Sequence, residues 1–502
     1  MDICESYLSR RISSFIDYEK QDTIERLIQI IIDITRVSYT KICGDNIDKN
    51  KDMIPAKELV LDLNGISISQ TTGEIKIKKK LAIKNLLYFT VFWGQLFLVN
   101  LVGMVSFKKK NKYSITIAYG LGLKQVVFNG SDSRFIDYCK DGPIKPLNNA
   151  NKIFVHDYWF KGNLSSTDVF YTKHPIAKLL YESNLSFNQR LYITYVQIIY
   201  VINYFIRIIK EPLVILLARD IAVCPTILGL DCYGYIKNIL ITNSWCIYQP
   251  LWMRGPSKRN YCVHEIFYSH NDKLVTFNKD KLTPDDFPML FKQKVDEYWV
   301  WTEGKKNELE NNGVKSKIHV VGPILWYLPE KDNTKIPDDE IRIAIFDIMP
   351  FDPKIRNSLG VIRNQYTTKN SILFLDDIVS ILHKLNEHTN KKIVLYLKHK
   401  RPHSDIHDVR YLKYVQELID KKIIIKLSND INLYNFLESC DLSINITYTS
   451  VAYISSHLKK MAIYYDPAEE IFPIYEKTPY IQFISGKNDL FKVITKLIIK
   501  DD

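Results

Sequence analysis

The last third of the chain alternates apolar runs of strand length with segments of helical periodicity. The strand-like runs are 341–347, 392–398, 422–428, 441–446 and 461–466, and the helical segments are 371–388, 409–420, 431–440 and 450–460. This alternation is typical of βαβ units, which form parallel sheets. The sequence therefore predicts an α/β fold with a Rossmann-like domain at residues 341–502.

The preceding region shows a weaker version of the same pattern. Strands are expected at 152–157, 238–244 and 297–304, and a long helix at 188–210. A chain of 502 residues is long enough for two domains. We therefore expect an N-terminal region at 1–150, a second Rossmann-like domain at 151–335 and a polar linker at 330–340. Two such domains would face each other across a cleft, which is the default ligand site.

Charge and cysteine content narrow the range of partners and compartments. The formal net charge is +12, which favours an anionic partner such as a membrane surface, a phosphorylated substrate or nucleic acid. The eight cysteines form neither a CxxC pair nor a zinc spacing, as expected for reduced thiols in a cytosolic protein. The N-terminus lacks the apolar core of a signal peptide, so a cytoplasmic location is expected.

One apolar segment, "LLYFTVFWGQLFLVNLVGMVSF" at 86–107, is long enough to cross a bilayer. Lysine clusters at 76–80 and 108–110 bracket it. Two interpretations stay open: a buried core helix with solvated flanks, or a segment held at an anionic membrane surface. The second would make the protein peripheral on the inner membrane.

Polar side chains follow three strands at the edge where parallel sheets bind ligands. One group, with cationic or titratable side chains, ends the strand at 392–398: Lys398, His399, Lys400, Arg401 and His403. A hydroxyl group follows 441–446, where Thr447, Thr449 and Ser450 precede a helix. Either Thr449 or Ser450 can cap that helix and form an anion site, and Asp466 ends the third strand.

These three strand ends together describe a site for a nucleotide-activated sugar. Lys and Arg neutralise phosphates, a His donates a proton to a leaving phosphate, and Asp466 accepts from a sugar hydroxyl. Simpler interpretations also exist for each group: a plain helix cap, a solvated run of charges, and a turn cap at Asp466.

The segment "SINITYTSVAYISSHLKKMAIYYDP" at 443–467 resembles bacterial surface-polysaccharide biosynthesis proteins named for a Pro-Phe-Thr-Ser motif. This chain keeps Thr449 and Ser450 but replaces Pro-Phe. The segments "KHKR", "IAIFDIMPF" at 343–351 and "VHEIFYSHN" at 263–271 resemble the same group.

The layout also resembles glycosyltransferases of the GT-B architecture, among them sialyltransferase-like and Kdo-transferase-like enzymes that use CMP-linked acidic sugars. That resemblance implies that His399 or His403 assists the leaving phosphate and that Thr449 and Ser450 bind it. No Asp-x-Asp pair occurs in the chain, so we expect cationic side chains instead of a metal at the leaving group. No cofactor is expected beyond the nucleotide-sugar substrate.

An inverting transferase also needs a base from the facing domain. Asp157 is the first candidate and Glu265 the second, with His156 and His264 beside them. A structural role is the alternative for each of the four.

Three functions stay open besides the expected one, a glycosyltransferase acting on a glycan or lipid-linked glycan acceptor. A CDP-glycerol-type polyol-phosphate transferase would use similar basic and His-containing loops. A non-catalytic glycan- or nucleotide-binding subunit would explain the changed motif. Nucleic-acid binding is the weakest, because no recognition motif occurs.

Overall fold

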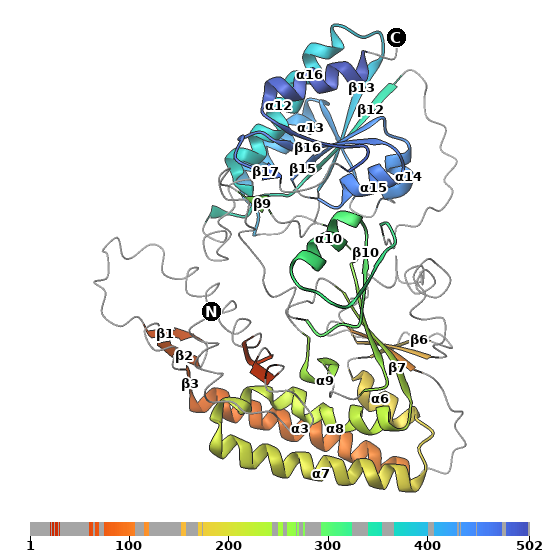
Figure 1. The fold of residues 1–502 in the computed structure, drawn as a ribbon. Coiled ribbons are helices and arrows are strands. Elements are labelled where there is room, and N and C mark those ends of the chain that lie inside the picture. The colour runs from red at the N-terminus through yellow and green to blue at the C-terminus, as the bar shows by residue number, and fades with distance from the viewer. Residues whose placement is uncertain are drawn as a thin grey trace.

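The computed structural model shows an elongated molecule with the C-terminal residues at one end and a layer of long helices at the other (Figure 1). It describes residues 21, 23–24, 26–28, 30, 60–63, 66–69, 75–105, 115–119, 152–156, 169–172, 174–242, 249–254, 259–267, 269–270, 275–276, 293–323, 340–353, 366–399, 406–428, 431, 433–447, 449–473 and 478–499. The predicted linker at 330–340 lies almost wholly outside these residues.

The C-terminal sheet has six parallel strands in the order β14-β13-β12-β15-β16-β18. The strands are β12 Glu340–Asp347, β13 Lys392–His399, β14 Ile424–Lys426, β15 Leu442–Ile446, β16 Met461–Asp466 and β18 Ile481–Ser485. The helices are α12 Thr368–Asn386, α13 Val409–Asp420, α14 Leu433–Glu438, α15 Val451–His457 and α16 Lys487–Ile498. The Rossmann-like arrangement predicted for this part of the chain is confirmed.

Apolar burial on both faces explains why these runs form a parallel sheet. All five residues of β15 are buried, and Ile345, Ile444 and Ile463 of adjacent strands are fully buried in one core. Each such side chain contributes about 1.5–3 kcal/mol when removed from water. Thr367 is the N-cap of α12, and its hydroxyl accepts a hydrogen bond from the Asn370 N–H at 3.2 Å.

The strand order places a topological switch point between β12 and β15. From β12 the chain continues outward to β13 and β14, and from β15 it continues the opposite way to β16 and β18. Open parallel sheets bind ligands beyond the carboxyl ends of the strands at this point. Asp347 ends β12, and residues 447–450 follow β15.

The N-terminal sheet has seven parallel strands in the order β11-β10-β8-β7-β4-β5-β6. The strands are β4 Ile115–Tyr119, β5 Lys152–His156, β6 Val169–Thr172, β7 Ile236–Thr242, β8 Cys262–Ile266, β10 Glu297–Val300 and β11 Lys317–Val320. The domain boundary expected at residue 151 cuts through this sheet, because β4 precedes that residue and lies between β7 and β5.

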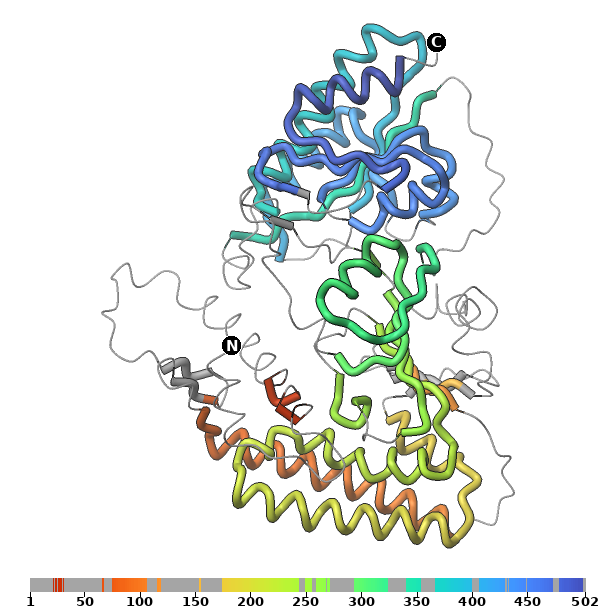
Figure 2. The backbone as a smooth tube through the Cα atoms, viewed as in Figure 1, coloured from red at the N-terminus to blue at the C-terminus, as the bar shows by residue number. Residues whose placement is uncertain are grey.

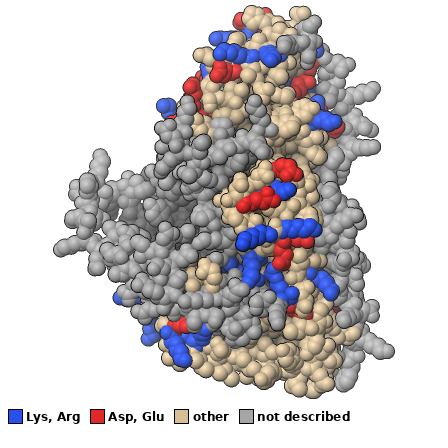
Figure 3. All heavy atoms as spheres, in the orientation of Figure 1, with Lys and Arg blue, Asp and Glu red and all other residues tan. Residues whose placement is uncertain are grey.

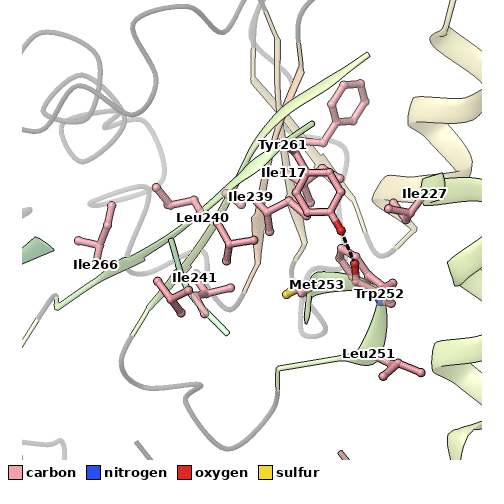
Figure 4. Close-up of a cluster of buried hydrophobic side chains, with 14 of the residues drawn as sticks. Ile117, Ile227, Ile239, Leu240, Ile241, Leu251, Trp252, Met253, Tyr261 and Ile266 are labelled. Atoms are coloured by element: carbon pink, nitrogen blue, oxygen red, sulfur yellow. Dashed lines mark hydrogen bonds between the residues drawn. The ribbon is translucent and has the colours of Figure 1, made fainter. Parts of the chain in front are cut away.

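A dense apolar core supports the N-terminal sheet (Figure 4). Ile239 and Ile241 of β7 are buried there with Trp252 and Met253 of the short helix α9 (Leu251–Arg254). The Tyr261 hydroxyl donates a hydrogen bond to the Trp252 carbonyl at 2.8 Å, the contact drawn as a dashed line (Figure 4). This bond satisfies a buried polar group and fixes the approach to β8.

Five helical elements form a layer at the end of the molecule away from the C-terminal domain (Figures 1 and 2). The layer comprises α3 Lys79–Val105, α6 Pro175–Glu182, α7 Phe187–Lys210, the 3₁₀ helix η1 Pro212–Leu217 and α8 Ala218–Cys232. A small antiparallel sheet precedes it: β1 Val60–Leu63, β2 Ile66–Ser69 and β3 Ile75–Ile77. The segments Lys79–Val105, Phe187–Lys210 and Pro212–Cys232 are long and apolar enough to cross a membrane by length and composition.

The two domains contact each other at several points. β9 (Val275–Thr276) of the N-terminal half pairs antiparallel with β17 (Phe472–Pro473) of the C-terminal half. Gly322, just after β11, adopts φ +76°. A Cβ atom built at this glycine would lie 3.6 Å from the ring of His457 in α15. The predicted fold, two Rossmann-like domains with a helical and partly apolar N-terminal region, is therefore confirmed.

Candidate active site

A buried carboxylate–imidazole pair lies at the switch point of the C-terminal sheet. Asp347 and His399 are register partners at the ends of the neighbouring strands β12 and β13. The Asp347 carboxylate oxygens lie 2.8 and 2.9 Å from Nδ1 of His399. The two side chains are only 1% and 3% exposed, so this interaction is shielded from water.

A third residue completes the arrangement around the carboxylate. The hydroxyl of Tyr411, in α13, donates a hydrogen bond to Asp347. Burial, followed by the nearby Asp347 charge, raises the pKa of Tyr411 well above its ordinary value, so the hydroxyl keeps its proton. Asp347 thus accepts from two donors, Nδ1–H of His399 and the Tyr411 hydroxyl.

These contacts determine which nitrogen of His399 is available for chemistry. A carboxylate accepts only, so Nδ1 carries the hydrogen and Nε2 holds the free lone pair of the neutral ring. Within the part of the chain that the structure describes, Nε2 is buried and has no hydrogen-bond partner. His399 therefore has the geometry of an oriented acid–base group at a ligand-binding edge.

Sequence analysis identified His399 but missed Asp347 and Tyr411. Asp347 carried the same signal as the other candidates, a polar residue ending a buried strand. Its pairing with His399 depends on β12 and β13 being neighbours, and strand order cannot be read from the local pattern. Tyr411 lies on a helix and carried no comparable signal.

Of the other predicted residues at the end of β13, the structure describes Lys398. Lys398 is 9% exposed, and its Nζ lies 3.5 Å from the carbonyl oxygen of His399. Lys400, Arg401 and His403 lie outside the described residues, so their predicted roles stay predictions. Lys398 and His399 are adjacent in a strand, where successive side chains point to opposite faces.

The hydroxyl residues after β15 are held more firmly than a simple cap requires. Thr447 and Thr449 are 0% and 3% exposed, and the Thr449 hydroxyl donates to Asn445 Oδ1 at 3.4 Å. Of the two candidate caps, Ser450 occupies the N-cap position of α15, but its side chain makes no capping hydrogen bond. Its hydroxyl oxygen instead accepts the His270 backbone N–H at 2.9 Å.

This bond joins the two domains at their ligand-binding edges. His270 follows β8 of the N-terminal sheet and is fully buried. Its ring stacks on Trp301, 6.0 Å between centroids, and meets the ring of Tyr453 in α15 edge-on at 4.1 Å. Sequence analysis did not single out His270, although it lies in the segment 263–271 that supported the resemblance.

Asp466 has the turn-capping contacts that were its alternative interpretation. Its carboxylate accepts backbone N–H bonds from Ala468 at 3.2 Å and from Glu470 and Ile471 at 2.8 Å each. Burial raises the pKa of Asp466, and these bonds partly oppose the shift. A donor-binding role for Asp466 stays a prediction.

The structure describes Glu265 and His156 among the predicted bases of the N-terminal domain, but not Asp157. Glu265 lies in β8, is fully buried, and pairs in register with Ile241 and Tyr298. Asp157 lies outside the described residues, while His156 ends β5.

Both ring nitrogens of His264 have partners within the N-terminal domain, as expected for a structural histidine. Its Nε2 lies 3.2 Å from Asn238 Oδ1, and its Nδ1 accepts from Trp299 Nε1–H at 3.3 Å. Burial lowers the pKa of His264 to about 4, partly opposed by Glu297. It is a neutral, fully bonded ring at ordinary pH.

No curated protein matches the sequence of this chain. Among solved structures, the wall teichoic acid polymerase TagF is similar at 13% identity and a TM-score of 0.41, over 84% of this chain and 89% of that one. UDP-GlcNAc 2-epimerase from Methanocaldococcus jannaschii is similar at 13% identity and a TM-score of 0.37, over 76% and 91%. TarM has 12% identity and a TM-score of 0.33, over 57% and 52%.

A family model described as "Polysaccharide biosynthesis PFTS motif protein" matches residues 199–494, more than half of the chain. The matched range includes the Asp347–His399 pair, the hydroxyl residues after β15 and the His270 contact. The resemblance seen in segment 443–467 is thereby confirmed. The chain belongs to the polysaccharide biosynthesis PFTS motif family.

Proposed function

We propose that this protein is a glycosyltransferase of polysaccharide biosynthesis, which takes a sugar from a nucleotide-sugar donor held at the carboxyl edge of the C-terminal sheet. The observation that carries the proposal is the buried Asp347–His399 pair with its hydrogen-bond donor Tyr411. In most buried structural histidines both ring nitrogens have a hydrogen-bond partner. Here Nε2 has no partner among the described residues.

In the proposed reaction, the bond between the anomeric carbon and the leaving phosphate oxygen breaks, and a bond to an acceptor hydroxyl oxygen forms. Protonated His399 donates the Nε2 proton to the leaving phosphate oxygen, and Asp347 stabilises the imidazolium before transfer. A positioned acid of this kind contributes about 10²- to 10⁴-fold to the rate.

Hydroxyls and cations would hold the donor phosphate. The Ser450 oxygen accepts from His270, which leaves the Ser450 hydrogen to donate to a phosphate oxygen. Lys398, with Lys400, Arg401 and His403, would neutralise the leaving group, so that no metal is required. Thr447 and Thr449 would shape the loop that receives it.

The acceptor hydroxyl must lose its proton to a base. Glu265 is the candidate among the described residues, and it lies on β8, the strand that leads to the His270 contact. Asp157 is the other candidate. A carboxylate from this domain would face the donor from the acceptor side.

The test is thermal stabilisation of the purified protein by CMP, CDP, UDP, GDP and TDP, followed by release of that nucleotide from its sugar conjugates. We expect one nucleotide to raise Tm selectively, and the shift to disappear in Ser450→Ala. Phosphate in the acceptor product would identify a polyol-phosphate transferase instead. A folded protein that binds nucleotide but never turns over a donor would favour the binding-subunit alternative.

A further inference from the structure

The helical layer has an outward face that is apolar where a soluble protein would be polar. On α3, Leu87, Val91 and Leu98 are 61–65% exposed. On α7, Tyr195, Ile202 and Ile209 are 55–83% exposed. We call this surface the apolar helix face. Neither helix contains an Asp or a Glu.

The inward side of the same two helices includes a few polar groups among its apolar ones, and these bond to neighbouring helices. Asn100 of α3 donates to the Arg190 carbonyl of α7 at 2.9 Å, and the Arg190 guanidinium donates to the Ser183 carbonyl at 2.9 Å. Gln197 donates to Thr226 of α8 at 3.0 Å. Large apolar groups on the exposed side depart from the usual pattern of a surface helix, whose exposed side is polar.

The packing favours a helix pair lying along a bilayer surface over one that crosses it. α3 and α7 run antiparallel, with Phe89 stacked on Tyr204 at 4.4 Å and Trp93 donating to the Gln197 carbonyl. Both pack on α8, which with η1 forms the apolar segment Pro212–Cys232, and the most apolar stretch of that segment is 89% buried in the protein. Figure 1 shows the pair at the lower end of the molecule, with the N-terminal sheet above it, toward the C-terminal domain.

Cations gather at one end of the apolar helix face, where α3 begins and α7 ends. Lys79, Lys80, Lys84 and Lys210 are exposed. Arg219, also exposed, lies 4.1 Å from the centroid of the Tyr88 ring, over which Lys84 Nζ lies at 5.7 Å. Blue side chains beside a largely tan lower end are visible in the space-filling view (Figure 3).

We propose that the apolar helix face docks in the plane of an anionic phospholipid bilayer. The exposed apolar side chains would enter the acyl boundary, and the cations would meet lipid phosphates. A second copy of the chain fits less well, because the two helices contribute no acidic side chain to pair with these cations. The membrane contact that was one interpretation of 86–107 would thus involve two helices, and it does not depend on the proposed chemistry.

The test is co-sedimentation of the full chain with preformed vesicles in detergent-free buffer. We expect strong binding to mixed phosphatidylcholine and phosphatidylglycerol, weaker binding to phosphatidylcholine alone, and partial release when salt rises from about 0.1 M to about 1 M. Val91→Glu with Ile202→Glu should abolish binding without lowering Tm, since both side chains point outward. Val409→Glu, at an exposed apolar position of α13, is the matched control and should bind normally.

A double lysine substitution tests the contribution of the cations separately from that of the apolar side chains. Lys79→Gln with Lys80→Gln should weaken partition into the anionic vesicles about 30-fold. Lys413→Gln with Lys421→Gln removes the same charge from exposed positions of the C-terminal domain and should change little. The proposal would be overturned if the wild-type protein bound to neither vesicle type. So would a stable dimer that Val91→Glu with Ile202→Glu converts to monomer.

Discussion

The Asp347 carboxylate lies 2.8 Å from Nδ1 of His399 although the two residues are 52 positions apart in the chain. Parallel pairing of β12 with β13 brings them together as register partners. The pair is buried at the carboxyl edge of the sheet, beside the point where the strand order reverses. This position supports both the proposed donor site and the role of His399 in it.

Replacing Asp347 by Asn should disable His399 without removing it. An Asn amide presents a donor to Nδ1 and favours the tautomer with hydrogen on Nε2. We expect kcat for donor turnover to fall at least 10²-fold, with little change in donor KM. Steady-state kinetics of the variant and the wild type at one pH will check this. Unchanged kcat would mean that the pair has only a structural role.

Ser450→Ala should weaken the contact between the domains. It removes the acceptor of the His270 N–H, and a buried donor without a partner costs about 1–3 kcal/mol. Denaturant unfolding and hydrogen exchange at the His270 amide will measure the loss. Ser456→Ala, whose hydroxyl donates to Pro479 at an exposed position, is the control and should cost less. Equal losses in both variants would contradict the interdomain role.

Two glycines of α3 should respond in opposite directions to alanine. A Cβ at Gly103 would lie 2.1 Å from the Arg190 guanidinium, so that side chain would have to leave its carbonyl acceptors. We expect Gly103→Ala to cost about 1–3 kcal/mol of stability. Gly94 has nothing within 4 Å of its Cβ position, so Gly94→Ala should stabilise by up to about 1 kcal/mol. Thermal unfolding of both variants gives the comparison.

His264 should make the N-terminal domain sensitive to acid. Its pKa is about 4 in the folded protein against an ordinary value of 6.5, so the unfolded chain binds more protons between these values. Stability is therefore lost as pH falls from about 6.5 to about 4, by about 3 kcal/mol in total. The groups facing the ring are Glu297, Asp296 and His319, of which the carboxylates oppose the shift.

Unfolding of His264→Gln across the same pH range tests this directly. The variant keeps side-chain hydrogen bonding but cannot titrate, so its stability should fall less steeply than that of the wild type. Parallel pH curves for the two proteins would assign the acid sensitivity to other groups.

The C-terminal strands were predictable to within a few residues because each is a buried apolar run between amphipathic helices. The N-terminal sheet was less predictable, since its strand β4, between β7 and β5, lies before residue 151 and was not recognised. Local pattern also failed at Ser450: a serine before a helix predicts a cap, but an acceptor was needed by the other domain. Asp347 and His270 gained their roles from strand order and domain contact, neither of which a local pattern encodes.

The most direct test of the central claim is donor turnover by His399→Gln against the wild type, with the exposed His388→Gln as matched control. The donor is the sugar conjugate of whichever nucleotide raises Tm. The account predicts that His399→Gln still binds that nucleotide but loses about 10²- to 10⁴-fold in kcat, while His388→Gln is unchanged. Full turnover by a folded His399→Gln protein would contradict the account.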